Sequence, residues 1–339
     1  MVDIRLSICM PTYNFGAFIG ETLEGIIKQL PGSVEIVVLD GGSTDDTAAV
    51  VQSFQHHCPM LSYHRQDHRG GIDRDIARTV ELARGEYCWL FSSDDLMHQG
   101  ALKRVLQEIE LGFDLYLCGL TLCTREMQPL RQHRVLNIGS DAAFDLCNKQ
   151  DRLRYFRMAE TTTAFFSFMG SLIFKKSRWD AIPFDESFDR SLWAHVARLF
   201  RMAPQGLRVK YLCESLLDKR GDNDSFMDKG LVHRYMMAVD GYHRLANTFF
   251  GEHTFEAQHI RRVVRNEFTA LRALAGLKVK AYEEGNLVDQ SLVDELAAKV
   301  YKGSPTLDRL KFFLYRTVPV PVWKLARAWY RAAKPYLFR

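Results

Sequence analysis

Hydrophobic residues in the first 125 positions alternate between two spacings that predict strands followed by helices. Continuous apolar runs, typical of strands buried on both faces, are separated by segments in which apolar residues recur every three to four positions. The expected strands cover 7–10, 34–39, 61–64, 86–91 and 114–123. Repeated units of this kind predict an α/β fold, with a mixed but mainly parallel sheet flanked by helices.

Polar residues and glycines mark the expected ends of the intervening helices. Ser43-x-x-Asp46 resembles a capping box that opens the second helix, and the fourth helix is expected to begin near Gln99. Gly85 and Gly112 stand where the third and fourth helices are expected to stop, because glycine readily adopts the backbone conformation beyond a helix end.

The chain becomes less regular after residue 125. Residues 126–230 mix short apolar runs with polar loops, whereas 231–339 follow helical periodicity, so three regions are predicted with boundaries near 125 and 230. No apolar run approaches the roughly 18 residues that span a bilayer, and the first residues show no basic-then-apolar signal segment. We therefore expect a protein that is neither secreted nor membrane-spanning.

Charge and cysteine content exclude two further classes of protein. The net charge is +4, but residues 305–339 contain eight Lys or Arg and one acid (+7), which leaves about −3 on the rest. A nucleic-acid-binding body would show a basic face instead, so no nucleic-acid partner is expected. The seven cysteines form no Cys-x-x-Cys pair, which favours a reducing compartment and argues against zinc.

Two of the predicted strands end at acidic residues. The run 34–39 leads into Asp40-Gly41-Gly42, and the run 86–91 leads into Ser92-Ser93-Asp94-Asp95. Ligands of open α/β sheets bind beyond the carboxyl ends of the strands. Acids at that edge indicate a metal-bridged diphosphate, although Asp94 and Asp95 would also serve as ordinary caps of the next helix. Neither Gly-x-Gly-x-x-Gly nor a Walker loop follows the first strand, so a dehydrogenase or kinase-like NTPase is not expected.

Several motifs occur in the order found in glycosyltransferase family 2. Pro11-Thr12-Tyr13-Asn14, Asp40–Asp45 and Ala83–Tyr87 before an acidic strand end resemble that family over residues 5–125. The stretches Gly70–Arg78, Ser191–His195 and Arg220–Ser225 resemble bacterial O-antigen transferases of the abequosyltransferase type. The resemblance implies a GT-A fold in which 1–125 form the nucleotide-sugar-binding half and 126–230 the acceptor-binding half.

The resemblance also implies a set of site residues. Asp40 would bind a pyrimidine base without choosing between UDP and CDP, and Tyr13 would stack on the base or sugar unless it is a packing aromatic. Lys219 and Arg220 would clamp the diphosphate, and Asp94 with Asp95 would bind Mg²⁺ or Mn²⁺. The nucleotide-binding residues implied are Pro11, Thr12, Tyr13, Asn14, Asp40, Gly71, Asp73, Ser92, Ser93, Lys219 and Arg220.

The chain departs from the family pattern at two points. Ser92-Ser93-Asp94 keeps only the last acid of Asp-x-Asp, so the Ser92 hydroxyl would replace the acid that touches the ribose. The family's Glu-Asp base falls on Ser191-Leu192, which leaves His195 and Asp189 as candidate catalytic bases. His195 would otherwise be a packed core residue, and a retaining mechanism would need no such base.

The basic tail has the division of an amphipathic helix. Lys324, Arg327, Arg331 and Lys334 fall on one side, and Val322, Leu325, Trp329 and Ala333 on the other. Such a helix suits an anionic membrane surface, although it would also pack on a neighbouring domain. Phe312–Tyr315 would add apolar surface.

Together these features predict a cytoplasmic glycosyltransferase on the inner face of the bacterial cytoplasmic membrane. It would move a sugar from a CDP- or UDP-sugar to a lipid-linked saccharide in O-antigen or surface-polysaccharide synthesis. Two alternatives remain: a catalytically silent relative that acts as a membrane-associated assembly module, and a sugar nucleotidyltransferase. The second would need a Gly-rich basic loop near the N-terminus, which positions 11–20 lack.

Overall fold

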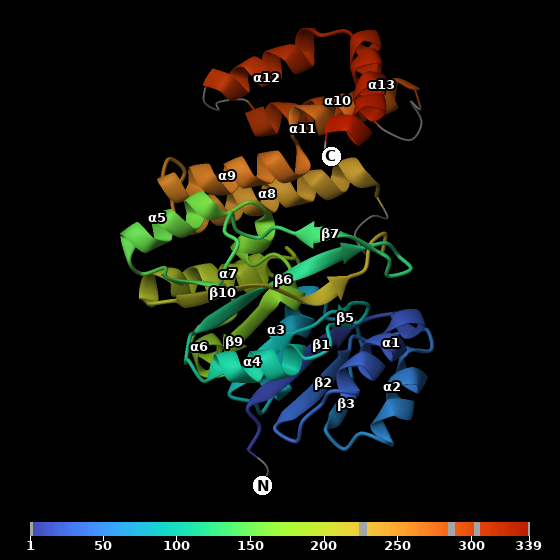
Figure 1. Ribbon diagram of the computed structural model, residues 1–339, viewed down its shortest axis with the longest axis vertical. Helices are drawn as coiled ribbons and strands as arrows, with labels where there is room; N and C mark the ends of the chain where they lie inside the picture. The colour runs from blue at the N-terminus through green and yellow to red at the C-terminus, as the bar shows by residue number, and fades with distance from the viewer. Residues whose placement is uncertain (1–2, 224–228, 284–288, 302–305, 338–339) are drawn as a thin grey trace. The chain divides into compact units, whose positions relative to one another are not determined.

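The computed structural model describes residues 3–223, 229–283, 289–301 and 306–337, and their side chains apart from those of 306 and 331–337. The chain divides into two compact units, Met1–Asn223 and Asp224–Arg339. The first unit is built around a ten-stranded sheet, and the described part of the second is helical (Figure 1).

The strands of the first unit form a mixed sheet. Its order is β3-β2-β1-β4-β9-β6-β10-β5, with β7 beside β6 and β8 beside β10. β1, β2, β3 and β4 are mutually parallel, β6 and β10 run parallel to each other, and β9 lies antiparallel between β4 and β6. The strands are β1 (Leu6–Thr12), β2 (Val34–Asp40), β3 (Leu61–Arg65), β4 (Tyr87–Leu90), β5 (Leu96–Met97), β6 (Leu115–Cys123), β7 (Pro129–His133), β8 (Ala142–Asp145), β9 (Leu172–Lys175) and β10 (Arg208–Lys219).

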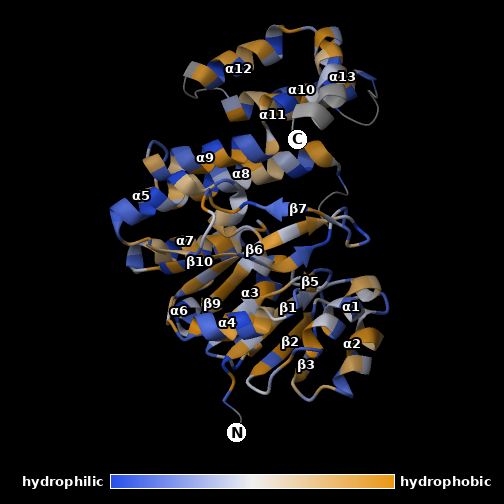
Figure 2. Ribbon diagram, in the orientation of Figure 1, coloured by the Kyte–Doolittle hydropathy of each residue, from blue (hydrophilic) through white to orange (hydrophobic). Residues whose placement is uncertain are grey.

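Helices cover both faces of this sheet, as predicted. Because side chains alternate along a strand, Ile8 and Met10 join a core that includes Leu23 of α1 and Val105 of α4, while α3 packs on β1 and β2 from the other side. Figure 2 shows the hydrophobic strands and the mixed colouring of these helices. The helices are α1 (Gly16–Ile27), α2 (Thr47–Gln55), α3 (Ile72–Leu82), α4 (Ala101–Ile109), α5 (Lys149–Met158), α6 (Lys176–Asp180) and α7 (Ala194–Met202).

The capping box predicted at Ser43-x-x-Asp46 is wrong. The backbone N–H of Thr47, where α2 begins, donates to the Asp45 carboxylate at 3.0 Å, and no side chain caps the helix from Asp46. The Ser43 hydroxyl instead accepts the backbone N–H of Asn14 at 2.9 Å. The polar residues after β2 therefore join two loops rather than open a helix by themselves.

Gly85 does not terminate α3, contrary to the prediction. The helix ends at Leu82, and the backbone N–H of Gly85 donates to the Ser7 hydroxyl at 2.8 Å. A Cβ atom at position 85 would lie 2.7 Å from the backbone nitrogen of Ser7. The glycine is thus required by the close approach of this loop to β1.

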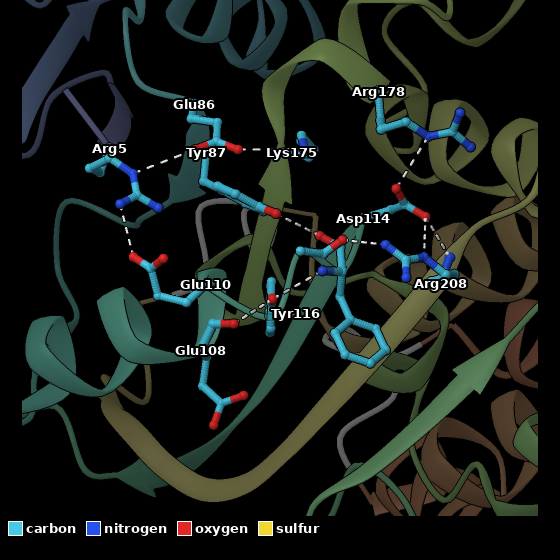
Figure 3. Close-up of polar contacts among 12 residues, drawn as sticks. Arg5, Glu86, Tyr87, Glu108, Glu110, Asp114, Tyr116, Lys175, Arg178 and Arg208 are labelled. Carbon is cyan, nitrogen blue, oxygen red and sulfur yellow. Dashed lines mark hydrogen bonds and ion pairs between the residues drawn. The ribbon is translucent and has the colours of Figure 1, made fainter. Parts of the chain in front are cut away.

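The amino-terminal edge of the sheet is bound by ion pairs and tyrosine hydrogen bonds (Figure 3). Arg5 pairs with Glu110 at 2.8 Å, and Asp114 pairs with Arg178 at 3.4 Å. Tyr87 and Tyr116 donate their hydroxyls to the backbone carbonyls of Phe113 and Glu108. The cations drawn at this edge have acidic partners within the protein, which is typical of a structural belt rather than a ligand site.

The second unit packs its described helices around an apolar core. α8 contacts α9 and α11, and α10 contacts α11, α12 and α13. Arg265 and Asp308 form a largely buried ion pair at 2.7 Å inside this unit. None of the described helices is both long and apolar enough to cross a membrane. The helices are α8 (Leu231–Phe249), α9 (Phe255–Phe268), α10 (Leu271–Glu283), α11 (Gln290–Tyr301), α12 (Thr306–Thr317) and α13 (Val320–Leu337).

Candidate active site

The carboxyl ends of β1, β2, β4 and β10 lie along one edge of the sheet, because these strands point the same way. The register pairs Thr12, the last residue of β1, with Asp40, the last residue of β2. The Ser93 hydroxyl donates to the Pro11 carbonyl at 3.3 Å, which ties the loop after β4 to the end of β1. β10 ends at Lys219. The predicted acidic strand ends thus share one edge with a basic one.

Asn14 fastens the loops after β1 and β2 to each other. Its backbone N–H donates to the Ser43 hydroxyl at 2.9 Å, and its side-chain oxygen accepts the backbone N–H of Thr44 at 2.8 Å. Its φ angle is 59°, a conformation that Asn tolerates better than most residues. The amide predicted to contact nucleotide therefore braces the loops that surround the site.

Asp40 is fully buried, and both of its carboxylate oxygens accept hydrogen bonds. Oδ1 accepts the backbone N–H of Ser43 at 2.7 Å, and Oδ2 accepts the hydroxyl of Tyr63 at 2.6 Å. Burial, followed by the bond to Asp40, raises the pKa of Tyr63 above its ordinary value. A base that reached Asp40 would share the carboxylate with Tyr63. Sequence reasoning missed this tyrosine because β3 ends in no distinctive motif.

Tyr13 is covered by a cation. The guanidinium carbon of Arg69 lies 4.1 Å from the centroid of the Tyr13 ring, from the loop that precedes α3. In the same region the buried Asp75 accepts the Gln66 amide at 2.7 Å, and burial raises the pKa of its carboxyl. Neither Arg69 nor Asp75 was predicted as a site residue. Only Gly71 and Asp73 of the Gly70–Arg78 stretch were predicted from the sequence as nucleotide-binding residues.

Asp94 and Asp95 form an acidic pair after β4, in which Asp94 is partly buried and Asp95 is buried. Oδ1 of Asp95 accepts the backbone N–H of Arg220 at 3.0 Å, whereas its Oδ2 has no hydrogen-bond partner within the described chain. Oδ2 of Asp94 accepts the amide of Asn223 at 2.8 Å. Burial, and then the charge of Asp94, raises the pKa of Asp95 to about 7. Burial is also the main cause that raises the pKa of Asp94.

Arg220 contacts both acids of the pair, with its backbone N–H on Asp95 and its guanidinium on the Asp94 backbone. Its Nε donates to the backbone carbonyl of Asp94 at 2.9 Å, and its Nη2 to Glu21 at 2.7 Å. Its Nη1 donates to the Arg125 carbonyl, so each guanidinium nitrogen has an acceptor within the protein. Lys219, the other residue predicted to clamp the diphosphate, has its ammonium 4.9 Å from the centroid of the Phe168 ring. Asp224 and Ser225 of the predicted loop lie outside the described residues.

Asp73 holds a loop from the other half of the unit. Its two carboxylate oxygens accept the backbone N–H groups of Leu192 at 2.8 Å and Ala194 at 3.0 Å. The side chain is 3% exposed, and burial is the main cause that raises its pKa. Gly71, which precedes α3, has a φ angle of 92° that a side chain would strain.

The two candidate bases have different surroundings. Asp189 accepts Arg74 Nε at 2.9 Å, and its side chain remains 18% exposed. His195 lies buried in the first turn of α7, and burial lowers its pKa to about 4. His195 is therefore neutral at pH 7, and the backbone groups of Ser167 and Phe166 lie close enough to act on its pKa.

Solved structures share the fold of this chain. Residues 1–349 of Staphylococcus aureus TarS, in complex with UDP-GlcNAc, match 97% of this chain and 92% of their own length, with a TM-score of 0.60 at 17% identity. The likeness shows the fold, and the protein is a glycosyltransferase of the GT-A class, with its acidic strand ends at the expected edge.

The sequence relatives define the family. Abequosyltransferase RfbV of Salmonella typhimurium is 32% identical over 253 residues, which cover 73% of this chain and 76% of the relative. A Campylobacter jejuni GalNAc(5)-diNAcBac-PP-undecaprenol beta-1,3-glucosyltransferase is 27% identical over 57% of this chain and 59% of its own length. The model of glycosyl transferase family 2 matches residues 7–180. The chain belongs to glycosyltransferase family 2.

Proposed function

We propose that the protein transfers a sugar from a nucleotide-diphosphate sugar to a lipid-linked oligosaccharide at a membrane surface. The observation that supports the donor most directly is the Asp94–Asp95 pair at the carboxyl edge of the sheet that also carries Asp40, with Asp95 buried and the charge of Lys219 acting on it. Acidic side chains at this edge could hold a cation, and that cation could bind the diphosphate of the donor.

The acidic pair fits a divalent cation. Oδ2 of Asp95 is a buried oxygen without a hydrogen-bond partner in the described chain, and the charge of Asp94 opposes ionisation of the Asp95 carboxyl unless positive charge is added. Oxygen ligands of this type suit Mg²⁺ or Mn²⁺, and a bound cation would neutralise charge on the departing diphosphate. The described residues hold no cluster of three His, Cys, Asp or Glu at any site, so phosphate oxygens and water would complete the shell.

The chain's own residues would then have distinct tasks. Asp40 accepts an N–H of the pyrimidine base, and Tyr13 stacks on the base or ribose once Arg69 moves from its ring. The Ser92 hydroxyl contacts the ribose. Lys219 balances the phosphates together with the cation. UDP and CDP both offer Asp40 an N–H donor, and so this acid alone does not choose between them.

Transfer forms a bond between an acceptor oxygen and the anomeric carbon and breaks the bond from that carbon to the diphosphate. In an inverting reaction a base removes the acceptor proton. Asp189 is better suited than His195, because its carboxylate is partly exposed and the ion pair with Arg74 at 2.9 Å orients it. His195 is buried.

The acceptor proposal uses the second unit and the relatives. The Campylobacter relative is named for a PP-undecaprenol substrate, and such a substrate would hold the enzyme at a membrane. Apolar side chains on α12 and α13 are exposed: Leu307 65%, Leu310 52%, Phe313 60%, Val322 51%, Leu325 72% and Trp329 69%. Of Phe312–Tyr315, Tyr315 is buried against Asp294. The side chains of Arg331, Ala333 and Lys334 lie outside the described residues.

The donor assignment is tested by a thermal-shift and turnover screen of CDP-, UDP-, GDP- and dTDP-sugars with Mn²⁺. We expect one pyrimidine-nucleotide sugar to stabilise the protein and to be hydrolysed or transferred. Asp94→Asn should reduce kcat at least a hundredfold, whereas Asp180→Asn, an exposed acid on α6, should leave kcat within twofold. Full turnover by Asp94→Asn would refute the cation role, and binding without turnover of any donor would favour a silent assembly module.

The membrane assignment is tested on vesicles that contain anionic phosphatidylglycerol. The full-length variant Leu325→Ser/Trp329→Ser should sediment at least tenfold less with the vesicles than the wild type, because burial of exposed apolar surface is lost. Leu111→Ser, a change at an exposed leucine of the first unit, is the matched control. Equal sedimentation of the three proteins would refute the membrane face.

A further inference from the structure

The loop between 189 and 194 adopts an unfavourable backbone. Arg190 has a φ angle of 57° and Leu192 one of 73°, and neither is a glycine. Side chains rarely occupy this region, and Leu has no polar side chain that could compensate locally. Such a conformation persists only when neighbouring contacts determine it, so other parts of the unit must hold this loop.

The backbone of the loop is held chiefly by one carboxylate. Asp73 accepts the backbone N–H groups of Leu192 and Ala194, one on each oxygen, and is 3% exposed. The intervening N–H, from Trp193, donates to the Ser191 hydroxyl at 3.0 Å. A charged acceptor that receives two buried backbone donors is a strong restraint, because loss of the carboxylate leaves both donors unpaired.

The residue next to Asp73 holds the side chains of the same segment. Arg74 donates Nε to Asp189 at 2.9 Å and Nη2 to Glu186 at 2.6 Å. Asp73 and Arg74 both lie in the first turn of α3. This helix follows the loop that places Arg69 over the Tyr13 ring. The first turn of α3 therefore links the loop next to Tyr13 with the segment that contains the candidate base Asp189.

We propose that Asp73 is a positioning residue for the 189–194 loop and does not itself contact the nucleotide. By fixing the loop backbone, Asp73 sets where Asp189 stands relative to the acceptor hydroxyl. The role of Asp189 toward an acceptor rests on the function proposed above, whereas the restraint on the loop does not. Loss of the restraint should lower the rate of transfer without weakening the donor complex.

The isosteric variant Asp73→Asn tests this role. An amide offers one acceptor oxygen in place of two, so one of the two backbone donors loses its partner. The loop should open more often, and trypsin should cut after the exposed Arg190 at least tenfold faster under native conditions. N-terminal sequencing of the new fragment should give Ser191-Leu192-Trp193. Arg78→Ala, which removes an exposed cation of α3, should leave the cleavage rate within twofold.

Binding and kinetics separate positioning from ligand contact. Kd values for the probes UDP and CDP with Mn²⁺ should stay within twofold in Asp73→Asn, and with an active donor kcat should fall at least tenfold at unchanged donor KM. A Kd that rises more than tenfold while cleavage after Arg190 is unchanged would overturn the proposal and make Asp73 a nucleotide ligand. If no donor is turned over, the proposed function fails and the cleavage rates still decide the role of Asp73.

A measurement on the wild type covers the case in which Asp73→Asn does not fold. Amide hydrogen exchange at Leu192 and Ala194 should be at least tenfold slower than in an unstructured peptide, because both N–H groups are bonded to Asp73. Unprotected exchange at these two amides would overturn the proposal.

Discussion

Asp95→Asn should make the ligand-free protein less sensitive to pH while abolishing the cation effect. Burial raises the pKa of Asp95 from 3.8 to about 7, so the folded protein holds a proton that the unfolded chain releases. The stabilisation from this proton is complete below pH 4 and is lost as the pH rises toward 7. Each pH unit well inside this window corresponds to about 1.4 kcal/mol, and the slope halves near pH 7, so the interval from pH 5 to 7 removes about 2 kcal/mol.

The assay is urea unfolding of wild type and Asp95→Asn at pH 5, 6, 7 and 8. The Asn oxygen can still accept the N–H of Arg220, but its amide would stand unpaired where Oδ2 was, at a cost of about 1–3 kcal/mol. The variant should therefore be less stable than wild type at pH 5 and should recover relative to it by pH 8. Mn²⁺ at pH 7.5 should stabilise only the wild type, by about 2.7 kcal/mol at a hundredfold excess over Kd. Parallel pH dependences of the two proteins would refute the reasoning.

Three further predictions concern residues at and away from the site. Tyr63→Phe should lower the free energy of unfolding by about 1–3 kcal/mol, measured in urea, because one oxygen of the buried Asp40 loses its donor. His195→Gln should keep kcat within threefold and leave the pH–rate profile from pH 6 to 8 unchanged, since a side chain with a pKa of about 4 does not titrate there. A hundredfold loss of kcat would identify His195 as the base. Glu35→Gln should weaken the bonds to Ser7 and Arg84 at the opposite edge and cost about 1–2 kcal/mol, while the Kd for UDP with Mn²⁺ stays within twofold.

The parallel half of the fold was predictable because its residues obey simple periodicities. β1 and β2 are buried along their whole length, so their apolar runs were visible in the sequence. β9 was not predicted: Leu172–Lys175 is only four residues long, and its antiparallel place between β4 and β6 depends on partners more than fifty residues away in sequence. Gly85 was misread because its need for space arises from Ser7, which a local pattern does not reveal.

At the site, the sequence indicated which residues gather but not what each one touches. Asp40 and Asp94 stand at the strand ends as predicted, since parallel strands bring their carboxyl ends together. Arg220 and Asp73, predicted as nucleotide contacts, have protein donors or acceptors that the sequence did not indicate. A charged residue near a phosphate site and one that supports the same site have the same sequence signature, and only tertiary contacts separate them.

Counting the donors on each buried acid shows where the site lacks positive charge. Asp40 and Asp73 have a protein donor on both oxygens, so their charges are compensated without a ligand. Oδ1 of Asp95 accepts the backbone N–H of Arg220, and Oδ2 has no hydrogen-bond partner in the described chain, although Lys219 and the Ser92 hydroxyl also lower the pKa of this carboxyl. Arg220 presents a backbone N–H to Asp95 because its guanidinium is engaged elsewhere, with Glu21 among its acceptors. Of these three acids Asp95 is therefore the least compensated, and a cation that binds this edge should do so by displacing the proton that Asp95 holds below pH 7.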